Sequence, residues 1–320
     1  MTSERAQVKT GQKKPVATRS PQPQAAIGVI GGSGLYELEA LKERREVAVA
    51  TPFGRPSGKI VLGSLEGRSV AFLARHGVGH TLLPSEINYR ANIFALKKLG
   101  VERILSVSAV GIMRDDIAPG HVVLPDQFYD LTHARDHTFF GRGIVAHVGM
   151  ADPVCAVLSG VVAGAGVWVG ATIHRGGTYL CMEGPQFSTR AESHIHRSWG
   201  AAGQISVIGM TNATEAKLAR EAEICYVTIA LATDYDCWHA AEADVTVDQV
   251  MRVIHDNVNL SKRLIQAAVG QMTSAARKCP CATALQYAIV TTPARIPPKT
   301  RAALAPIIGK YIGAKSSGAH

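Results

Sequence analysis

The stretch YVTIALATDYDCW, from Tyr226 to Trp238, runs a strand-like segment directly into two carboxylates. Its first six residues are apolar, aromatic or β-branched, which is typical of a strand buried inside a sheet. Asp234 and Asp236 follow, and side chains two residues apart on an extended chain point to the same side. Both aspartates are therefore expected to face one pocket. The alternative is an ordinary turn after a strand, where aspartate is common, and the DYD segment alone favours that alternative.

Strand-like and helix-like segments alternate along the chain. The expected strands are residues 26–30, 59–62, 69–73, 103–107, 121–124, 171–173, 206–208 and 226–231. The expected helices are residues 85–99, 214–222 and 247–269, with Thr214 as a possible cap of the second. This alternation predicts an α/β fold around a mostly parallel or mixed sheet. We predict a single domain at residues 25–280, a disordered basic tail at 1–24 and a peripheral C-terminal extension at 281–320.

Composition and charge exclude several classes of protein. The chain has 320 residues, of which 47% are hydrophobic and 18% charged, with a net charge of +9. All of that excess charge lies in residues 1–24 and 281–320, so the central part is neutral overall and we expect no nucleic-acid partner. No apolar run approaches the roughly 20 residues of a membrane span, and the N-terminus lacks a signal-peptide core. We therefore expect a cytoplasmic protein with no membrane partner.

Six cysteines are scattered along the chain without CxxC spacing. Most lie in apolar segments, where a free thiol behaves as a small core residue, and this pattern favours a reducing compartment. The pair Cys279-Pro-Cys281 can in principle bind a metal or form a strained disulfide. Two ligands do not make a zinc site, however, so we expect unpaired thiols and no metal.

Polar residues at the ends of four expected strands suit an anion: Ser33, Arg75 with His76, Ser108 and Thr211. Arginine offers a planar fork to a phosphate or carboxylate, histidine adds one donor, and a glycine loop leaves backbone N–H groups free. The loop GVIGGSGLY at residues 28–36 lacks the glycine spacing of a dinucleotide site. Because α/β sheets bind ligands at the carboxyl ends of strands, these residues either converge on one small oxyanion or are four unrelated strand ends. The sequence leaves both open.

Eight blocks in order resemble the trimeric purine nucleoside phosphorylase family, and within it the 5′-methylthioadenosine phosphorylase branch. The blocks cover about residues 26–265 and read GVIGGSGLY, RHGVGHTLLPSEINYRANI, SAVGIMRDDIAPG, DQF, VAHVGMADPVC, MEGPQFSTRAES, GMTNATEAKLAREAEICY and ATDYDCW. The resemblance implies a single α/β domain with a mixed, partly barrelled central sheet flanked by helices, assembled as a homotrimer. It also implies phosphorolysis of S-methyl-5′-thioadenosine to adenine and 5-methylthioribose 1-phosphate, in purine and methionine salvage. No metal or organic cofactor is implied, since phosphate is a co-substrate.

The resemblance implies three groups of site residues. Phosphate would be held by Ser33, Arg75, His76, Ser108, the Ala109 backbone and Thr211. The nucleoside would contact Phe187, Met210, Asp234, Asp236 and, from a neighbouring subunit, His147. Ser188 and Val247 would bias the pocket toward the methylthio substrate. Asp234 would be catalytic, because a carboxyl at purine N7 that is neutral or shares a proton stabilises the departing base.

Some positions depart from the family pattern and some alternatives remain. Ser33 and Ser108 stand where threonine is common, Gln186 stands where arginine is common, and the loop before Met210 is longer than usual. Another substrate, such as methylthioinosine or inosine, is an alternative, although Asp234 rather than asparagine favours a 6-amino base. A nucleoside-binding protein without turnover is an alternative from a different class.

Overall fold

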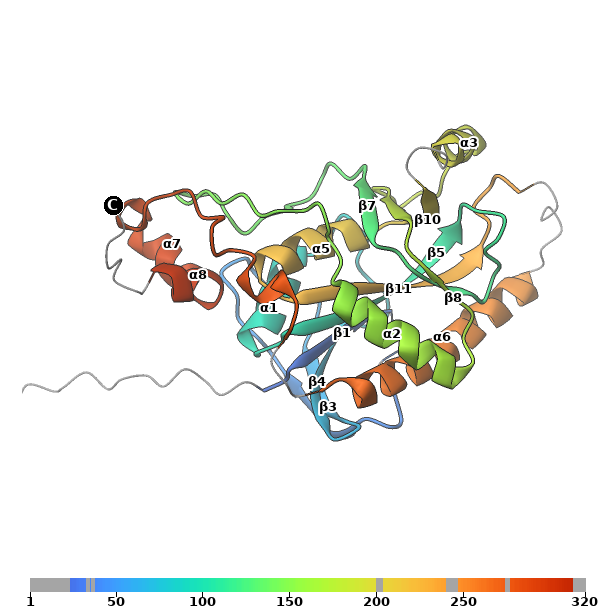
Figure 1. Cartoon of the computed structure of the whole chain (residues 1–320), viewed down its shortest axis with the longest axis horizontal. Helices are drawn as coiled ribbons and strands as arrows, with labels where there is room; N and C mark the ends of the chain where they lie inside the picture. Colours follow the sequence, from blue (N-terminus) through green and yellow to red (C-terminus); the bar gives the residue numbers. More distant parts are fainter. Residues whose placement is uncertain are drawn as a thin grey trace, which may run out of the picture.

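The computed structural model describes residues 24–32, 35, 38–199, 204–239, 247–273 and 277–312, with the backbone alone at 247–252 and 254. The predicted basic tail therefore lies almost entirely outside the described residues. Within them, a mixed eleven-stranded sheet runs through the centre and helices cover both of its faces (Figure 1). None of the described helices combines the length and the apolar character needed to cross a membrane.

The sheet branches at its longest strands. Its main path is β2 (Lys42–Val47), β3 (Ile60–Leu65), β4 (Arg68–Ala74), β1 (Ile27–Gly31), β5 (Arg103–Ile112), β10 (Ile205–Gly209), β9 (Thr178–Cys181) and β7 (Gln127–Asp130). A side branch leaves β5 through β11 (Cys225–Asp234), β6 (Val122–Leu124) and β8 (Ile173–Arg175). The sheet does not close into a barrel among the described strands. The predicted α/β fold with a mixed central sheet is confirmed.

Four of these strands run parallel and deliver their ends to one edge. β1 pairs in parallel with both β4 and β5, and β5 pairs in parallel with β11. Their carboxyl ends therefore lie together. β10 runs antiparallel to β5 and pairs with the carboxyl end of that strand, Val207 with Ile112 and Ile208 with Gly111. The loops that follow β1, β4 and β11 therefore all start at the same end of the parallel strands.

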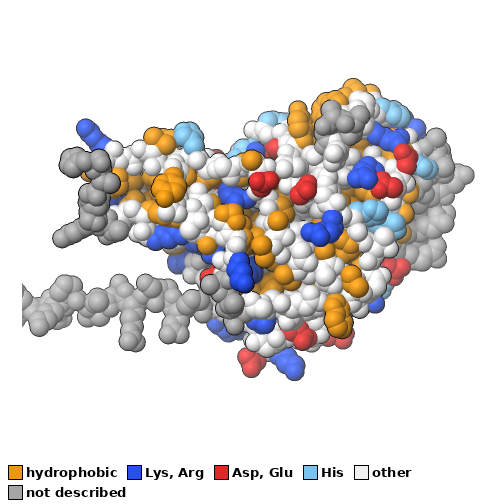
Figure 2. Space-filling model, viewed as in Figure 1, with side chains coloured by type: hydrophobic (Ala, Val, Ile, Leu, Met, Phe, Trp, Pro, Cys, Tyr) orange, Lys and Arg blue, Asp and Glu red, His pale blue; other side chains and the backbone are white. Residues whose placement is uncertain are grey.

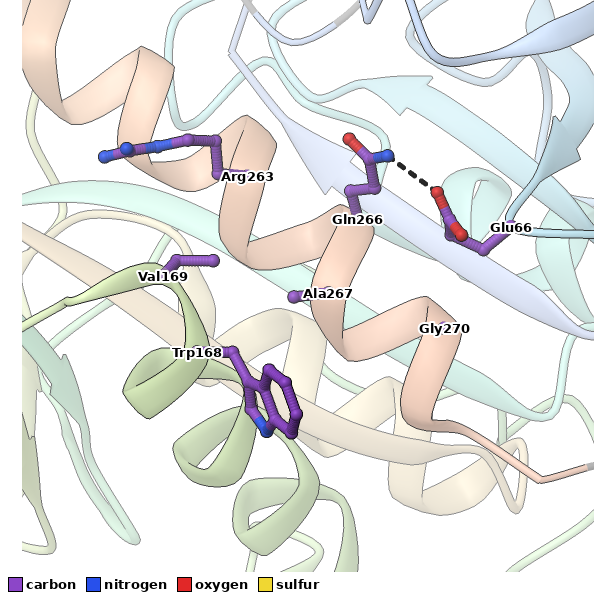
Figure 3. Close-up of a pocket in the computed structure, with 7 residues that line it drawn as sticks. All are labelled: Glu66, Trp168, Val169, Arg263, Gln266, Ala267 and Gly270. Carbon is purple, nitrogen blue, oxygen red and sulfur yellow. Dashed lines mark hydrogen bonds between the residues drawn. The ribbon is translucent and has the colours of Figure 1, made fainter.

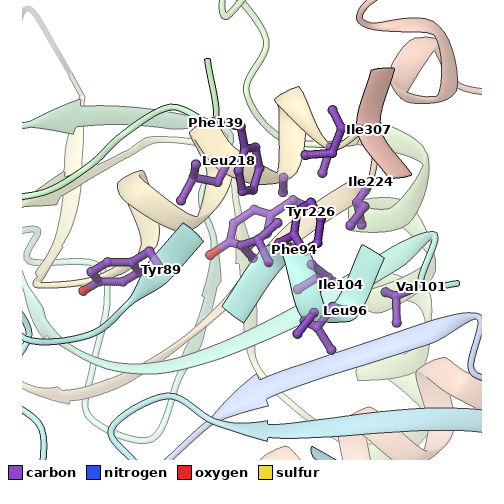
Figure 4. Packing of buried hydrophobic residues seen from close by; sticks show 14 of the residues in the cluster. Tyr89, Phe94, Leu96, Val101, Ile104, Phe139, Leu218, Ile224, Tyr226 and Ile307 are labelled. Atoms are coloured by element: carbon purple, nitrogen blue, oxygen red, sulfur yellow. The ribbon is translucent and has the colours of Figure 1, made fainter. Parts of the chain in front are cut away.

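Alternate residues of the central strands fill two different cores. Ile104 and Tyr226 pack on one face against α1 (Tyr89–Lys98), α5 (Asn212–Glu221) and residues 285–308, as Figure 4 shows. Their neighbours Leu105 and Val227 pack on the other face against α2 (Ala156–Val169) and α6 (Val247–Gln271). β5 and β11 are thus buried on both faces, which explains their nearly continuous apolar sequences.

The sequence located most central elements and missed those without an apolar pattern. All eight expected strands and three expected helices are present with shifted ends; the strand expected at 171–173 lies at Ile173–Arg175. β2 reads KERREV and is almost wholly exposed, so it carries no apolar signal. β7, β9, α2 and α3 (Arg190–Ser198) were also missed. α5 begins at Asn212 with Thr211 as its cap, not at Thr214, because Thr214 lies buried within the helix.

Residues 277–312 form an arm together with the loop at 139–148 (Figure 1). The arm contains η3 (Pro280–Thr283), η4 (Pro293–Arg295), α7 (Pro298–Ala303) and α8 (Ala305–Ile312). Ala146 bridges to Ile289, and the His147 N–H donates to the Ala288 carbonyl at 2.9 Å. Leu285 and Ile308 are fully buried in the core that α1 and α5 share. The C-terminal segment therefore positions the loop that carries His147.

Candidate active site

Arg75 begins the loop after β4, beside the glycine loop that follows β1. Gly31 pairs with Ala74, and the Arg75 N–H donates to the Gly31 carbonyl at 3.1 Å. The start of the loop that contains Ser33 thus lies next to Arg75, although Ser33 itself is outside the described residues. Two of the four strand ends singled out in the sequence are therefore neighbours.

The guanidinium of Arg75 is buried and almost fully engaged by protein groups. Its Nε donates to Glu215 Oε1 at 2.6 Å, and its Nη2 donates to Glu215 Oε2 at 3.2 Å and to Ser106 Oγ at 2.6 Å. Its Nη1 donates to the Val107 carbonyl at 2.7 Å. These bonds use four of the five N–H groups of an arginine. Arg75 thus organises this edge of the sheet, and its contact with phosphate stays a prediction.

The same network fixes the start of α5. The Asn212 Nδ2 lies within 3.0 Å of three buried hydroxyls on β5 and β11, those of Ser106, Tyr226 and Thr228, which share its two N–H groups. Thr211, the N-cap, is buried and its hydroxyl donates to Asn212 Oδ1 at 3.0 Å. The positive end of the α5 dipole is therefore held against the same edge as Arg75, and a helix N-terminus favours an anion.

Ser108 and Ala109 lie in the second half of β5, just beyond Ser106. Ser108 is two residues beyond Ser106, so its side chain leaves the same face of the strand. Its hydroxyl is half-buried and donates to the Ala109 carbonyl at 3.2 Å, and Ala109 is exposed. Arg75 and Asn212 both donate to Ser106, two residues before Ser108, and Thr211 contacts Asn212, so these residues lie near one another. Their convergence on one anion stays a prediction.

His76 follows Arg75, and one of its ring nitrogens is bonded to the backbone. Its Nδ1 lies 2.9 Å from the Leu82 carbonyl, which can only accept, so Nδ1 carries the proton. Burial lowers the pKa of His76 to about 4, against the opposing effect of that hydrogen bond, and the Arg75 charge lowers it further. The ring stacks on His80 with centroids 4.2 Å apart. In that tautomer the remaining nitrogen, Nε2, carries a lone pair, and the contact of His76 with phosphate stays a prediction.

A turn brings Asp234 and Asp236 together. β11 ends at Asp234, and Asp236 has a left-handed backbone with φ of 52°. The Asp236 N–H donates to Asp234 Oδ1 at 2.9 Å, and the Thr233 hydroxyl donates to Asp234 Oδ2 at 2.6 Å. The chain is not extended through Asp236, and the turn that the DYD segment alone favoured is present. The two side chains lie close together because a hydrogen-bonded turn joins them.

The two carboxyl groups differ in their environments. Burial raises the pKa of Asp234, and the negative charge of Asp236 raises it further, while the bonds from Thr233 and the Asp236 N–H oppose this shift. One oxygen of Asp236, Oδ2, is buried and has no hydrogen-bond partner within the described part of the chain. The pair therefore combines a carboxyl whose pKa is raised with a buried oxygen that can accept a hydrogen bond.

Gly111 makes the room that the two aspartates occupy. It pairs with Asp234 across the β5–β11 ladder. A methyl group at Gly111 would lie 3.3 Å from Asp236 Cβ, 3.6 Å from Asp234 Oδ1 and 2.9 Å from Ile208 Cγ2. The turn is also anchored by Trp238, whose indole N–H donates to the Ile112 carbonyl at 2.7 Å. The end of β5 thus sets the position of both carboxylates.

The segment at residues 182–188 lies beside this turn. The Cys237 thiol is 3.3 Å from the Ser188 carbonyl, and a methyl group at Gly184 would lie 2.5 Å from Met210 Sδ. Ser188 and Met210 are therefore close to the aspartates and to the start of α5. Phe187 is 83% exposed, so its stacking against a base stays a prediction.

Two predicted residues lie away from this cluster or beyond description. His147 is exposed on the arm, where a contact with a second subunit stays a prediction. Val247 is the first residue of α6, and its side chain is outside what the structure describes.

A separate groove of about 500 Å³ lies elsewhere on the surface (Figure 3). It is formed by the C-terminal parts of α2 and α6 and by the β3–β4 turn, and the Gln266 amide donates to Glu66 at 2.6 Å across it. None of the predicted site residues lines this groove. Glu66 precedes β4 whereas Arg75 follows it, so the groove lies at the amino end of β4. The aspartates lie at the opposite edge, with the carboxyl ends of the parallel strands.

Sequence reasoning missed three residues that build the site. Glu215 neutralises Arg75, Asn212 ties α5 to the strands, and Gly111 leaves space for the carboxylates. Each lies inside a block that was quoted for its resemblance. Polar residues in the first turn of a helix after a buried strand were the available signal for Asn212 and Glu215.

Comparison with known proteins finds similarity over most of the chain. The model of the phosphorylase superfamily matches residues 26–270. The S-methyl-5′-thioadenosine phosphorylase of Geobacter sulfurreducens is 60% identical, covering 89% of this chain and 99% of that relative. A crystal structure of methylthioadenosine phosphorylase from an antarctic soil metagenomic library is 48% identical with a TM-score of 0.85, covering 89% of this chain and 99% of that one. A mutant adenosine/methylthioadenosine phosphorylase of Schistosoma mansoni in complex with methylthioadenosine is 35% identical with a TM-score of 0.70, covering 77% and 90%.

Glu215→Gln should destabilise the protein strongly. The substitution keeps the shape of the side chain but leaves the buried Arg75 charge without its counterion, which costs about 3–5 kcal/mol. Chemical denaturation measures the loss. The control is Glu46→Gln, which breaks the exposed pair with Lys59 and should cost less than about 1 kcal/mol. Equal losses in the two variants would contradict the central role of the buried pair.

Gly111→Ala should also destabilise the protein, by about 1–3 kcal/mol, because the added methyl group overpacks the region between Ile208 and Asp236. Thermal and urea unfolding check this expectation. Gly58→Ala is the matched control, since a methyl group there meets no atom within 4 Å. A neutral effect of Gly111→Ala would show that the aspartates do not depend on this gap.

Proposed function

This chain belongs to the phosphorylase superfamily, and we propose that it catalyses the reversible phosphorolysis of S-methyl-5′-thioadenosine to adenine and 5-methylthioribose 1-phosphate. The observation that carries the proposal is the pair Asp234 and Asp236 at the carboxyl end of β11. Asp234 has a raised pKa, and Asp236 has a buried oxygen without a hydrogen-bond partner among the described residues. The names of relatives that match nearly their whole length support the same reaction.

The two aspartates suit the departing base. When the bond between ribose C1′ and adenine N9 breaks, its electron pair goes to the base and positive charge is left on the ribose. A protonated Asp234 donates to N7 and so stabilises the leaving adenine. Oδ2 of Asp236 can accept from the 6-amino group, which satisfies an oxygen that otherwise lacks a partner.

The other side of the site suits phosphate. The start of α5 at Thr211 and the hydroxyl of Ser108 offer donors to an anion, with Arg75 behind them. The lone pair on His76 Nε2 can accept from the P–OH of hydrogen phosphate. A phosphate oxygen then forms the new bond to C1′ as the base leaves. Phosphate thereby acts as co-substrate, and the described residues would hold it without a metal ion.

We also propose that the chain assembles as a trimer, as the resemblance to the trimeric purine nucleoside phosphorylase family implies. Apolar side chains are exposed along the arm and α2: Val145, Val157, Val167, Trp168, Tyr287 and Val290. Figure 2 shows hydrophobic side chains along the arm and over the middle of the face that is in view. Exposed apolar patches of this kind are typical of interfaces between subunits. His147, on the same arm, would then reach the 5′ pocket of a neighbouring copy.

A product assay with and without phosphate tests the reaction. We expect phosphate-dependent release of adenine, fastest from methylthioadenosine among methylthioadenosine, adenosine, inosine and methylthioinosine. Asp234→Asn should lower kcat by about 10²–10⁴-fold, the usual contribution of a general acid, while nucleoside affinity is largely kept.

Three results would contradict the proposal in different ways. Preferential release of hypoxanthine would overturn the assignment of Asp234 and Asp236 to a 6-amino base. Base release that does not need phosphate would indicate a hydrolase. Binding without turnover, unchanged in Asp234→Asn, would indicate a protein that only binds nucleosides.

His147→Ala should raise the KM for methylthioadenosine several-fold and leave the KM for adenosine nearly unchanged, because His147 is proposed to contact only the 5′ group. The comparison of the two substrates is itself the control for misfolding. His133, another exposed histidine, provides a matched variant that should change neither KM. An unchanged KM for methylthioadenosine in His147→Ala would remove the cross-subunit contact.

A further inference from the structure

Four cysteines that are far apart in sequence meet at the amino end of β11. The sulfur atoms of Cys155, Cys225, Cys279 and Cys281 all lie within 4.8 Å of one another, and those of Cys225 and Cys279 are 3.3 Å apart. Three of the thiols are buried and Cys279 is half-buried. They come from three segments: the N-cap of α2, the first residue of β11, and η3 of the arm. The reaction proposed above uses none of them.

The arrangement has the geometry of a tetrahedral metal site. Zinc–sulfur bonds of about 2.3 Å place the four sulfurs of a tetrahedron about 3.8 Å apart, which falls within the observed spread. Four soft thiolates without an open position are the ligand set of a structural zinc ion. We propose that Cys155, Cys225, Cys279 and Cys281 bind one zinc ion. Binding deprotonates the four thiols, so that Zn²⁺ and four Cys–SH give a dianionic tetrathiolate centre and four protons.

Groups around the cluster suit its negative charge. The Leu158 N–H donates to Cys155 Sγ at 3.5 Å, and Arg277 Nη1 lies 3.9 Å from Cys225 Sγ. The same Nη1 donates to the carbonyls of Glu102 and Glu223, which fixes the guanidinium beside the thiols. N–H donors and a held cation next to thiolates are the surroundings that orient and stabilise metal ligands.

The position of the cluster assigns it a structural role. Asp234 lies at the other end of the ten-residue strand β11, roughly 30 Å away at about 3.3 Å per residue. A metal there cannot take part in chemistry at the aspartates. It would instead join α2, β11 and the arm at one point. Through the contacts of Ala146 and His147 with residues 288–289, it would also hold the loop on which His147 lies.

Metal analysis of the full-length protein tests this proposal. After expression with zinc and removal of loosely bound ions, we expect one zinc per chain by elemental mass spectrometry. Titrating the native protein with a mercurial reagent in the presence of a zinc dye should release one zinc as four thiols react. Cobalt substituted for zinc should show thiolate-to-cobalt charge transfer and the visible bands of a tetrahedral centre.

Variants separate the site from the other thiols. Cys279→Ser removes the half-buried ligand and should lower bound zinc at least fivefold. It should also speed amide hydrogen exchange in residues 279–291 and 141–148. Cys181→Ser and Cys237→Ser are the controls outside the cluster and should keep one zinc. The mercurial titration uses the native chain, so it decides the question even where a variant fails to fold.

Some outcomes would overturn the zinc assignment. These are four thiols that react without zinc release, two disulfides that only a reductant opens, and a stoichiometric metal other than zinc. Equal zinc loss in Cys279→Ser and in the Cys181 and Cys237 controls would also overturn it. None of these measurements depends on phosphorolysis, so their failure is distinct from failure of the proposed reaction.

Discussion

The guanidinium of Arg75 and the carboxylate of Glu215 meet inside the protein although 140 residues separate them in sequence. Both side chains are almost completely buried, so each needs the other to offset the loss of water around its charge. Ser106 and Tyr226 add hydroxyls to the same carboxylate, which ties β4, β5 and β11 to the first turn of α5. The start of α5, where we propose that an anion binds, and the loop after β4 are therefore held in one orientation before any ligand arrives.

The second constraint is the space that Gly111 leaves at the end of β5. Asp234 stands opposite Gly111 in the ladder, and the turn after Asp234 folds Asp236 back against the same point. Burial raises the pKa of Asp234, and the nearby negative charge of Asp236 raises it further. The buried ion pair positions the proposed phosphate region and the gap at Gly111 positions the proposed base region. Because β5 contributes to both, movement of this strand would disturb the two regions together.

The amino end of β11 lies at the cysteine cluster, away from the aspartates. Its first residue, Cys225, joins three other thiols and brings the arm against α2, while its last residue, Asp234, belongs to the site. One strand thereby connects the proposed structural centre to the proposed chemistry. The arm also carries the loop with His147, so the packing of the C-terminal segment bears on substrate contacts that would come from a neighbouring copy.

The sequence by itself determined the alternating α/β elements, the buried strand that ends at Asp234, and the polar residues at four strand ends. These depend on local periodicity and on residue types, which a chain displays without folding. It did not determine that Glu215 would neutralise Arg75 or that Asn212 would tie α5 to the central strands. Cys155 and Cys225 stand 124 and 54 positions before Cys279 and show no spacing pattern with it, so the sequence did not indicate that these cysteines would meet. Only the tertiary structure decided these points, because each requires burial and contact between segments that are distant along the chain.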